Sequence, residues 1–177
     1  MLRRLLAFLT FPGIVAHEFA HAWACRRLGV RVHRVCYLRF GNPMGYVLHE
    51  APANALQHIA IAVAPFFVST TLALAASLAG CLLARSPFFP GAHDAAAVAA
   101  AWLGFALALH AFPSAGDGDA LWDDVKRSGV SLFAKLLLIP VVGVIRLAQA
   151  GTRFWLDALF ALCIVALPPA ALLAAMA

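Results

Sequence analysis

The chain has 177 residues, of which 64% are apolar and only 12% are charged. Soluble globular domains run close to half apolar and a quarter charged, so the composition excludes an ordinary soluble domain. The net charge of +5 does not indicate a nucleic-acid partner, because the arginines flank apolar segments instead of forming a basic and aromatic surface. The length suits one compact bundle, and we expect residues 1–177 to form a single domain embedded in a lipid bilayer.

Long apolar segments follow one another along the chain. A run of about 20 apolar residues can cross the hydrocarbon layer as a helix. The expected spans, about five in number, cover residues 5–24, 56–84, 95–112, 132–150 and 154–175. The fourth is the weakest, because Lys135, Pro140 and Arg146 interrupt it. A short, kinked or partly interfacial helix is the alternative for that segment.

The connection between the first two spans has a different pattern of apolar and polar residues. Residues 30–51 alternate apolar and polar side chains around the turn-forming stretch Gly41-Asn42-Pro43-Met44-Gly45. Two short β-rich runs on either side of such a turn predict a hairpin, and a polar connecting loop is the alternative. The expected fold is therefore an all-α integral membrane bundle with a small β-hairpin between its first two helices.

Basic residues favour one orientation in the membrane. The connections at residues 25–55 and 113–131 hold seven Lys and Arg residues, against five at the opposite ends of the spans. Loops rich in Lys and Arg tend to stay in the cytoplasm. We therefore expect these two connections to face the cytoplasm and the N-terminus to face outward.

The first apolar segment contains His17-Glu18-Phe19-Ala20-His21, an HExxH pattern. Residues four apart lie on one helix face, so both imidazoles can bind one zinc ion. Glu18 is rotated away from that face, and a carboxylate there can take a proton from a water molecule that zinc activates. Two histidines and a glutamate inside an apolar helix are costly unless paired or functional. A polar cluster that only packs helices together is the alternative.

A third protein ligand completes a catalytic zinc site and leaves one position open. Glu50 is the only other glutamate, and it ends the expected hairpin, which makes it a poor candidate. The remaining candidates are Asp117 and Asp119, just past the third apolar segment. If the first segment runs from outside to inside, the third does too, so either aspartate would reach the membrane face of His21.

Two stretches of this sequence resemble a known family. GIVAHEFAHAWACRRLG at residues 13–29 and FPSAGDGDALW at residues 112–122 are similar to the motifs of the site-2 protease family of intramembrane zinc proteases. The resemblance covers about residues 5–122, which would form the catalytic core, with additional helices at about residues 131–175. Gly116-Asp117-Gly118 stands in place of the family's Leu-Asp-Gly, so the resemblance implies Asp117, not Asp119, as the third ligand.

The resemblance also singles out His110, three residues before Pro113, where the family often has an asparagine. We predict that His110 donates a hydrogen bond to the developing oxyanion, with a helix-packing role as the alternative. The catalytic residues would then be Glu18 and His110. The metal ligands would be His17, His21 and Asp117, holding one Zn²⁺ per chain.

These features predict a zinc metalloendopeptidase that hydrolyses peptide bonds in or near the transmembrane segments of membrane proteins. A membrane helix hides its scissile carbonyls in internal hydrogen bonds, so cleavage requires local unwinding. An edge of the hairpin could hold the unwound segment by β-strand addition. Two alternatives stay open, a non-enzymatic membrane metal-binding or transport protein and an inactive protease-like scaffold. The sequence predicts no oligomeric state.

Overall fold

The computed structural model describes residues 2–85, 93–127 and 130–175, and 75% of these are helical. The described part contains seven helices and two strands. In chain order the elements are α1 (Leu2–Leu9), α2 (Phe11–Arg27), β1 (Val32–Cys36), β2 (Tyr46–His49), α3 (Ala55–Leu83), α4 (His93–Leu109), α5 (Ala115–Lys126), α6 (Leu132–Thr152) and α7 (Leu156–Ala175).

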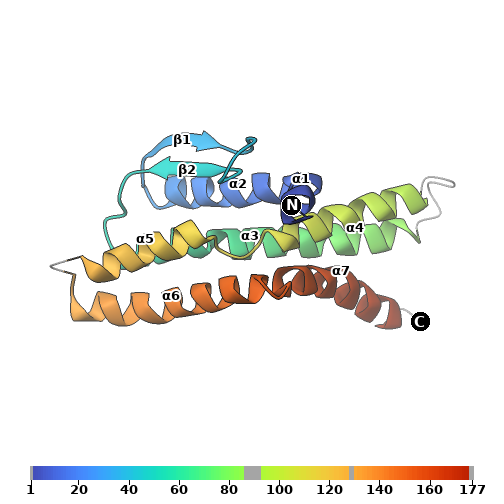
Figure 1. Cartoon of the computed structure of the whole chain (residues 1–177). Helices are drawn as coiled ribbons and strands as arrows, with labels where there is room; N and C mark the ends of the chain where they lie inside the picture. The colour runs from blue at the N-terminus through green and yellow to red at the C-terminus, as the bar shows by residue number, and fades with distance from the viewer. Residues whose placement is uncertain (1, 86–92, 128–129, 176–177) are drawn as a thin grey trace.

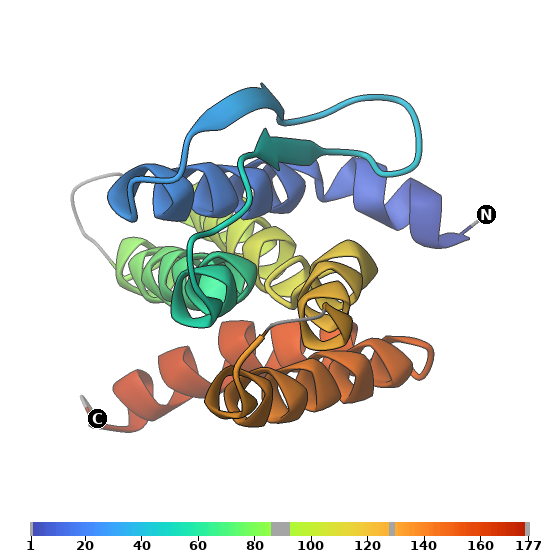
Figure 2. The same ribbon diagram turned by 90° about the vertical axis from the view of Figure 1, so that its left-hand side faces the viewer.

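The elements stack in layers. Figure 2 shows the hairpin lying over α2, which lies over α3, α4 and α5, with α6 and α7 on the far side. The longest helix, α3, runs the length of the molecule through the middle layer (Figure 1). It begins where the side chain of Asn54 accepts a hydrogen bond from the backbone N–H of Gln57, a standard N-cap.

Within the described residues, three helices are long and apolar enough to cross a membrane, namely α3, α6 and α7. The helices α1 and α2 pass the same test only as a pair, and they are bent by 74° at Thr10. The third expected span, which forms α4, is a shorter apolar helix. The expectation of apolar membrane-type helices is thus confirmed for these three, whereas the number of spans is not fixed by length and composition.

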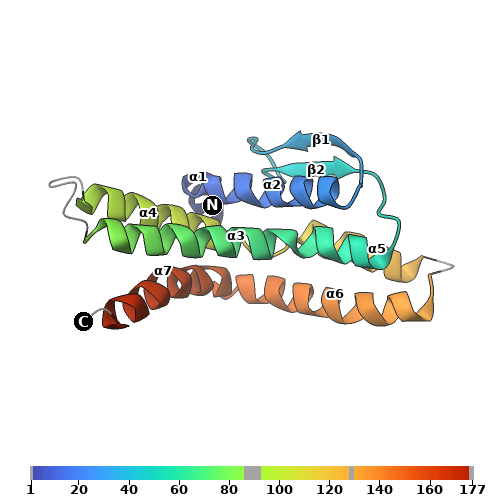
Figure 3. The ribbon, with the colours of Figure 1, turned by 180° about the vertical axis from the view of Figure 1, so that it is seen from behind.

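Two consecutive helix pairs are arranged end to end. Figures 1 and 3 show α4 followed by α5 along the long axis, and α6 followed by α7 in the return direction. Accordingly α6 packs against α5, and α7 packs against α3 and α4. The sequence suggested two separate spans at residues 132–150 and 154–175. The structure instead continues in one direction through the junction, where Trp155 adopts a left-handed φ of 62°.

The predicted β-hairpin is confirmed. The strands β1 and β2 pair antiparallel, with Val35 opposite Val47 and Cys36 opposite Tyr46. The register shifts near Val32, at the start of the sheet. The hairpin packs on α2, so the loop that joins its strands lies close to the HExxH pattern.

Small residues allow α2 to approach α4 very closely. Gly13 faces the backbone of Ala106, and a Cβ atom at position 13 would overlap the Ala106 carbonyl. Ala106 is fully buried, and Ala20 and Ala24 of α2 are buried against Ile61 and Ala64 of α3. Small residues at helix contacts are typical of membrane bundles, because they let backbones come together. This close contact brings the end of α4 within reach of the histidines of α2.

Candidate metal centre

His17 and His21 project from one face of α2, as their four-residue spacing predicts. Both are buried, with 8% and 7% of their surfaces exposed. Their Nε2 atoms lie 3.2 Å apart. The helix that carries them begins with Pro12 in its first turn, where a missing N–H costs nothing.

Each histidine is oriented by a backbone carbonyl. The Nδ1 atom of His17 lies 2.8 Å from the carbonyl oxygen of His110, and Nδ1 of His21 lies 2.9 Å from that of Ile61. A carbonyl oxygen only accepts hydrogen bonds, so each Nδ1 carries the proton and donates it. Both Nε2 atoms are then left with a lone pair directed inward, which is how histidines are held in metal sites.

The chain leaves these two carbonyls free for a physical reason. In an α-helix the carbonyl of Ile61 would accept a hydrogen bond from the N–H of residue 65, but Pro65 has no N–H. His110 follows the last residue of α4, and the N–H of Ser114 four residues later donates to Asp117 instead. Two interruptions of helical hydrogen bonding therefore supply the acceptors that orient His17 and His21.

Asp117 reaches the two histidines from the first turn of α5. Its Oδ1 atom lies 3.3 Å from Nε2 of His21, and Oδ2 lies 3.9 Å from Nε2 of His17. Ser114 caps the helix and fixes the carboxylate, because its N–H and its hydroxyl both donate to Oδ2, over 2.6 and 2.7 Å. These two hydrogen bonds from Ser114 stabilise the charged form of the carboxylate and lower the pKa of Asp117. The carboxylate is therefore ionised at neutral pH.

The three side chains together fit a metal ion. Their ligand atoms all lie within 4.8 Å of one another. Tetrahedral zinc with bonds of about 2.0 Å requires ligand atoms about 3.3 Å apart, close to the observed Nε2–Nε2 and Nε2–Oδ1 distances. Two imidazole lone pairs and a carboxylate facing one another are all acceptors, and a cation between them would satisfy all three. Imidazole and carboxylate are also ligands that zinc accepts.

Glu18 lies beside this group without belonging to it. It is 9% exposed, and its carboxylate has no hydrogen-bond partner among the residues that the structure describes. The hairpin loop covers it closely at Gly45, where a Cβ atom would lie 2.6 Å from Cγ of Glu18 and 2.8 Å from Oε1. Only glycine fits at position 45 with Glu18 in this position. The Glu18 carboxylate is thus held next to His17, His21 and Asp117, which we call the metal group, and no described residue occupies its oxygens.

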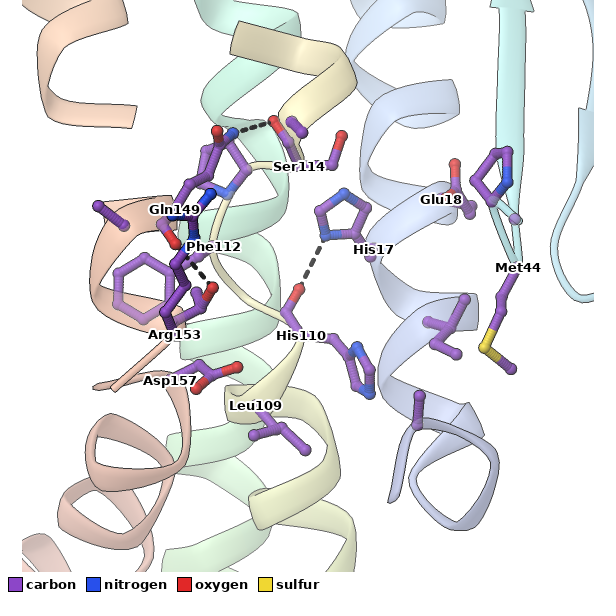
Figure 4. Close-up of a pocket in the computed structure, with 18 of the residues that line it drawn as sticks. His17, Glu18, Met44, Leu109, His110, Phe112, Ser114, Gln149, Arg153 and Asp157 are labelled. Atoms are coloured by element: carbon purple, nitrogen blue, oxygen red, sulfur yellow. Dashed lines mark hydrogen bonds between the residues drawn. The ribbon is translucent and has the colours of Figure 1, made fainter. Parts of the chain in front are cut away.

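His110 contributes its backbone to the site, while its ring faces elsewhere. The ring Nε2 lies 2.8 Å from the hydroxyl oxygen of Thr10, and that hydroxyl donates to the carbonyl of Leu6. The His110 ring therefore donates to Thr10, at the bend between α1 and α2. Figure 4 shows the carbonyl of His110 directed at His17 and the ring directed away from it. The structure brings His110 to the site through its carbonyl.

Asp119, the other candidate ligand, lies outside the metal group. Its carboxylate is exposed and accepts a hydrogen bond from Arg146 over 2.8 Å. The helix α5 turns the two aspartates to different faces, so only Asp117 meets the histidines. Sequence reasoning did not identify the roles of Ile61, Ser114 and Gly45. Of these, Ile61 could have been found, since Pro65 stands four residues after it.

A cavity of about 680 Å³ opens beside His17 and Glu18. It is bounded by α2, by the hairpin loop, by the α4–α5 junction and by the α6–α7 junction. Both junctions, where the helices are interrupted, line this cavity. A second cavity of about 500 Å³ touches His17, His21 and Asp117 from the other side. Two cavities therefore border His17 and Glu18.

Comparison with protein-family models, with curated proteins and with solved structures gave no match to this chain. The chemistry of the site itself is therefore the basis for assigning a function.

Proposed function

We propose that this chain is a membrane-embedded zinc metalloendopeptidase of the type that its motifs resemble, acting on peptide bonds in or near transmembrane segments. One observation carries the proposal. Two Nε2 atoms and a carboxylate oxygen converge, each histidine is oriented by a backbone carbonyl, and a glutamate with no partner among the described residues lies next to them. A purely structural cluster needs neither three converging acceptors nor a free carboxylate.

The proposed ligands are His17, His21 and Asp117, which leave a fourth position open. Zinc in this position would polarise a water molecule and lower its pKa towards neutrality. Glu18 would accept a proton from the attacking water and return it to the leaving amine. The close approach of the hairpin loop at Gly45 supports this role, because it limits the rotamers that the Glu18 side chain can adopt.

The position of His110 favours a positioning role over direct contact with substrate. Its carbonyl fixes the tautomer and direction of His17, as outer hydrogen-bond partners do in metal sites. The predicted oxyanion role stays a prediction, and it would require the ring to leave Thr10. His110 is therefore proposed as the residue that aims a ligand.

For the membrane, we propose that α3, α4, α7 and the bent pair α1–α2 lie in the bilayer, with the metal site towards the cytoplasm. The helix α6 continues end to end into α7, so we place it partly at the cytoplasmic interface. The basic hairpin and the end of α5 would then be cytoplasmic. Single cysteines at Lys126 and Arg85, in a chain whose four native cysteines are replaced, test this. A membrane-impermeant thiol reagent should reach position 126 only from the cytoplasmic side and position 85 only from outside. The reverse pattern would overturn the orientation and leave the site unaffected.

The protease proposal is tested by Glu18→Gln. Glutamine keeps nearly the same volume and polarity but cannot accept the proton, so hydrolysis should fall by on the order of 10²–10⁴. Zinc content should stay the same, because the ligands are untouched. The measurement is cleavage of a detergent-solubilised membrane-protein substrate together with zinc analysis. Glu50→Gln is the matched control, since Glu50 is half exposed on the hairpin.

The outcomes separate the three functions. A non-enzymatic metal-binding or transport protein would bind zinc in both forms, and Glu18→Gln would leave its activity intact. An inactive scaffold would hydrolyse nothing in either form. Equal cleavage by the wild type and Glu18→Gln would contradict the role of Glu18 as the base and the hydrolytic mechanism that depends on it.

A further inference from the structure

The cavity next to Glu18 has a polar end that the proposed chemistry does not use. Its far side is formed by the last turns of α6 and by the residues that follow. Arg146, Gln149 and Arg153 line it, and their spacing of three and four residues puts them on one face of the helix. Figure 4 shows Gln149, Arg153 and Asp157 across the cavity from Glu18, with His17 between them. The cavity thus joins the proposed base to a stripe of hydrogen-bond donors.

The charges of this stripe are only partly balanced. Asp157 is 8% exposed and pairs with Arg3 over 3.1 Å. Arg146 donates to Asp119 over 2.8 Å. Arg153 has no ion-pair or hydrogen-bond partner for its guanidinium among the residues that the structure describes. Within that part of the chain, a cation therefore remains uncompensated at the end of the cavity.

Arg153 is exposed at the α6–α7 junction, and it lines the same cavity as His17 and Glu18. An arginine without a partner at the wall of such a cavity is placed to bind an anionic group of a molecule that enters it. The guanidinium presents five N–H donors in a plane, which suits the two oxygens of a carboxylate. Gln149 also donates to the carbonyl of Ser114, the residue that caps Asp117. The donor stripe and the metal ligand are therefore parts of one connected surface.

We propose that Arg153, flanked by Arg146, receives a carboxylate of the peptide that is cleaved at the metal site. This rests on the proposed function for the identity of the ligand as a peptide, and it adds the substrate class, a peptide with an acidic group close to the scissile bond. The carboxylate belongs either to an Asp or Glu side chain or to a free C-terminus. A peptide is favoured over a lipid headgroup because the cavity is continuous with Glu18 and His17.

The test measures binding separately from cleavage. Zinc-loaded, full-length Glu18→Gln in zwitterionic detergent is titrated with fluorescent apolar peptides in which a single Glu is moved along a Gln-containing sequence. A further pair of peptides differs only in a free or amidated C-terminus, which separates the two sources of the carboxylate. A charged hydrogen bond to Arg153 should make the best acidic peptide bind about tenfold tighter than its neutral match.

Variants assign the effect to Arg153. Arg153→Gln should abolish the preference for the acidic peptide, whereas Arg153→Lys should keep part of it. Lys135→Gln removes one positive charge from the same helix, away from the lining of the cavity, and should keep the full preference. Zinc content reports whether each variant is folded. If Arg153→Gln fails to fold, loss of the preference with rising salt and its reduction in Arg153→Lys make the same assignment.

The following results would contradict the proposed carboxylate site or the proposed protease function. Equal binding of acidic and neutral peptides at every position, or an unchanged preference in Arg153→Gln, overturns the inference. Displacement of the acidic peptide by phosphatidylglycerol but not by phosphatidylcholine vesicles, with equal peptide affinities in detergent, identifies a headgroup site and also overturns it. If the preference holds but zinc-loaded wild type cleaves none of the bound peptides, the carboxylate site stands and the protease function fails.

Discussion

The helix α5 makes two contacts between a histidine and an aspartate, and they differ in kind. At its start, Asp117 meets His17 and His21, whose Nδ1 atoms donate to backbone carbonyls and whose Nε2 atoms face the carboxylate. Two turns later, Asp124 accepts a hydrogen bond of 2.6 Å from Nδ1 of His58. The two contacts use the same residue types, but Asp117 meets histidines of α2 and Asp124 meets a histidine of α3.

The difference lies in how the donors are distributed over the two oxygens of each carboxylate. Asp124 has a donor on each oxygen, His58 on Oδ2 and Arg127 at 3.2 Å from Oδ1, so the pair is complete without a metal. Asp117 has both donors of Ser114 on Oδ2, while Oδ1 faces Nε2 of His21, which carries no hydrogen when His21 is neutral and donates from Nδ1. A carboxylate oxygen without a donor, facing a histidine lone pair, therefore indicates a metal centre, and proximity of His and Asp alone does not.

The largest expected effect is the removal of the ligand from the incomplete contact. Asp117→Asn should lower zinc affinity by more than about 100-fold, beyond the 10–100-fold typical of outer partners, and should abolish hydrolysis. Asp119→Asn is the matched control, because Asp119 is exposed and paired with Arg146. Zinc titration against a competing chelator measures both. A larger loss in Asp119→Asn would show that the structure assigns the wrong carboxylate.

A change to one of the orienting carbonyls should have a smaller effect. Pro65→Ala restores an N–H that competes with His21 for the carbonyl of Ile61. We expect zinc affinity to fall about tenfold, at the low end for an outer partner, while the thermal stability of the metal-free chain does not fall. Pro140→Ala, in α6, is the control for removing a helix proline away from the site. Unchanged affinity in Pro65→Ala would mean that Ile61 does not hold His21.

The contact between His58 and Asp124 should contribute to stability and have no effect on zinc binding. Asp124→Asn removes a charged partner from His58, which is largely buried, and should cost about 1–3 kcal/mol of unfolding free energy. Zinc content should not change. Asp123→Asn is the control, because Asp123 is fully exposed and its pKa is lowered chiefly by Lys126. Loss of zinc in Asp124→Asn would remove the distinction between the two contacts.

Sequence reasoning anticipated the elements better than their arrangement. Apolar length identified α3, α6 and α7, and the turn at Gly41–Gly45 identified the hairpin. Hydropathy does not state whether a helix turns back, so the end-to-end order of α6 and α7 could not be read from residues 132–175. That order depends on packing against α3, α4 and α5, which involves residues far away in the chain.

For the candidate site too, local features were predictable from the sequence and long-range contacts were not. A four-residue spacing on a helix is a local property, so the approach of His17 to His21 was predictable. The choice of Asp117 over Asp119 came from a resemblance, and the structure supplies its physical basis in the cap by Ser114. The ring of His110 and the cover of Glu18 by Gly45 depend on contacts between distant segments, which no local pattern encodes.

The two hydrogen bonds of His110 connect two distant parts of the chain. The ring of His110 donates a hydrogen bond to Thr10, and its carbonyl accepts one from His17. His110 therefore connects the bend between α1 and α2 with a histidine of the metal group. The N-terminal helix and a proposed metal ligand are therefore connected through the ring and the carbonyl of a single residue, although they lie about one hundred residues apart from it along the chain.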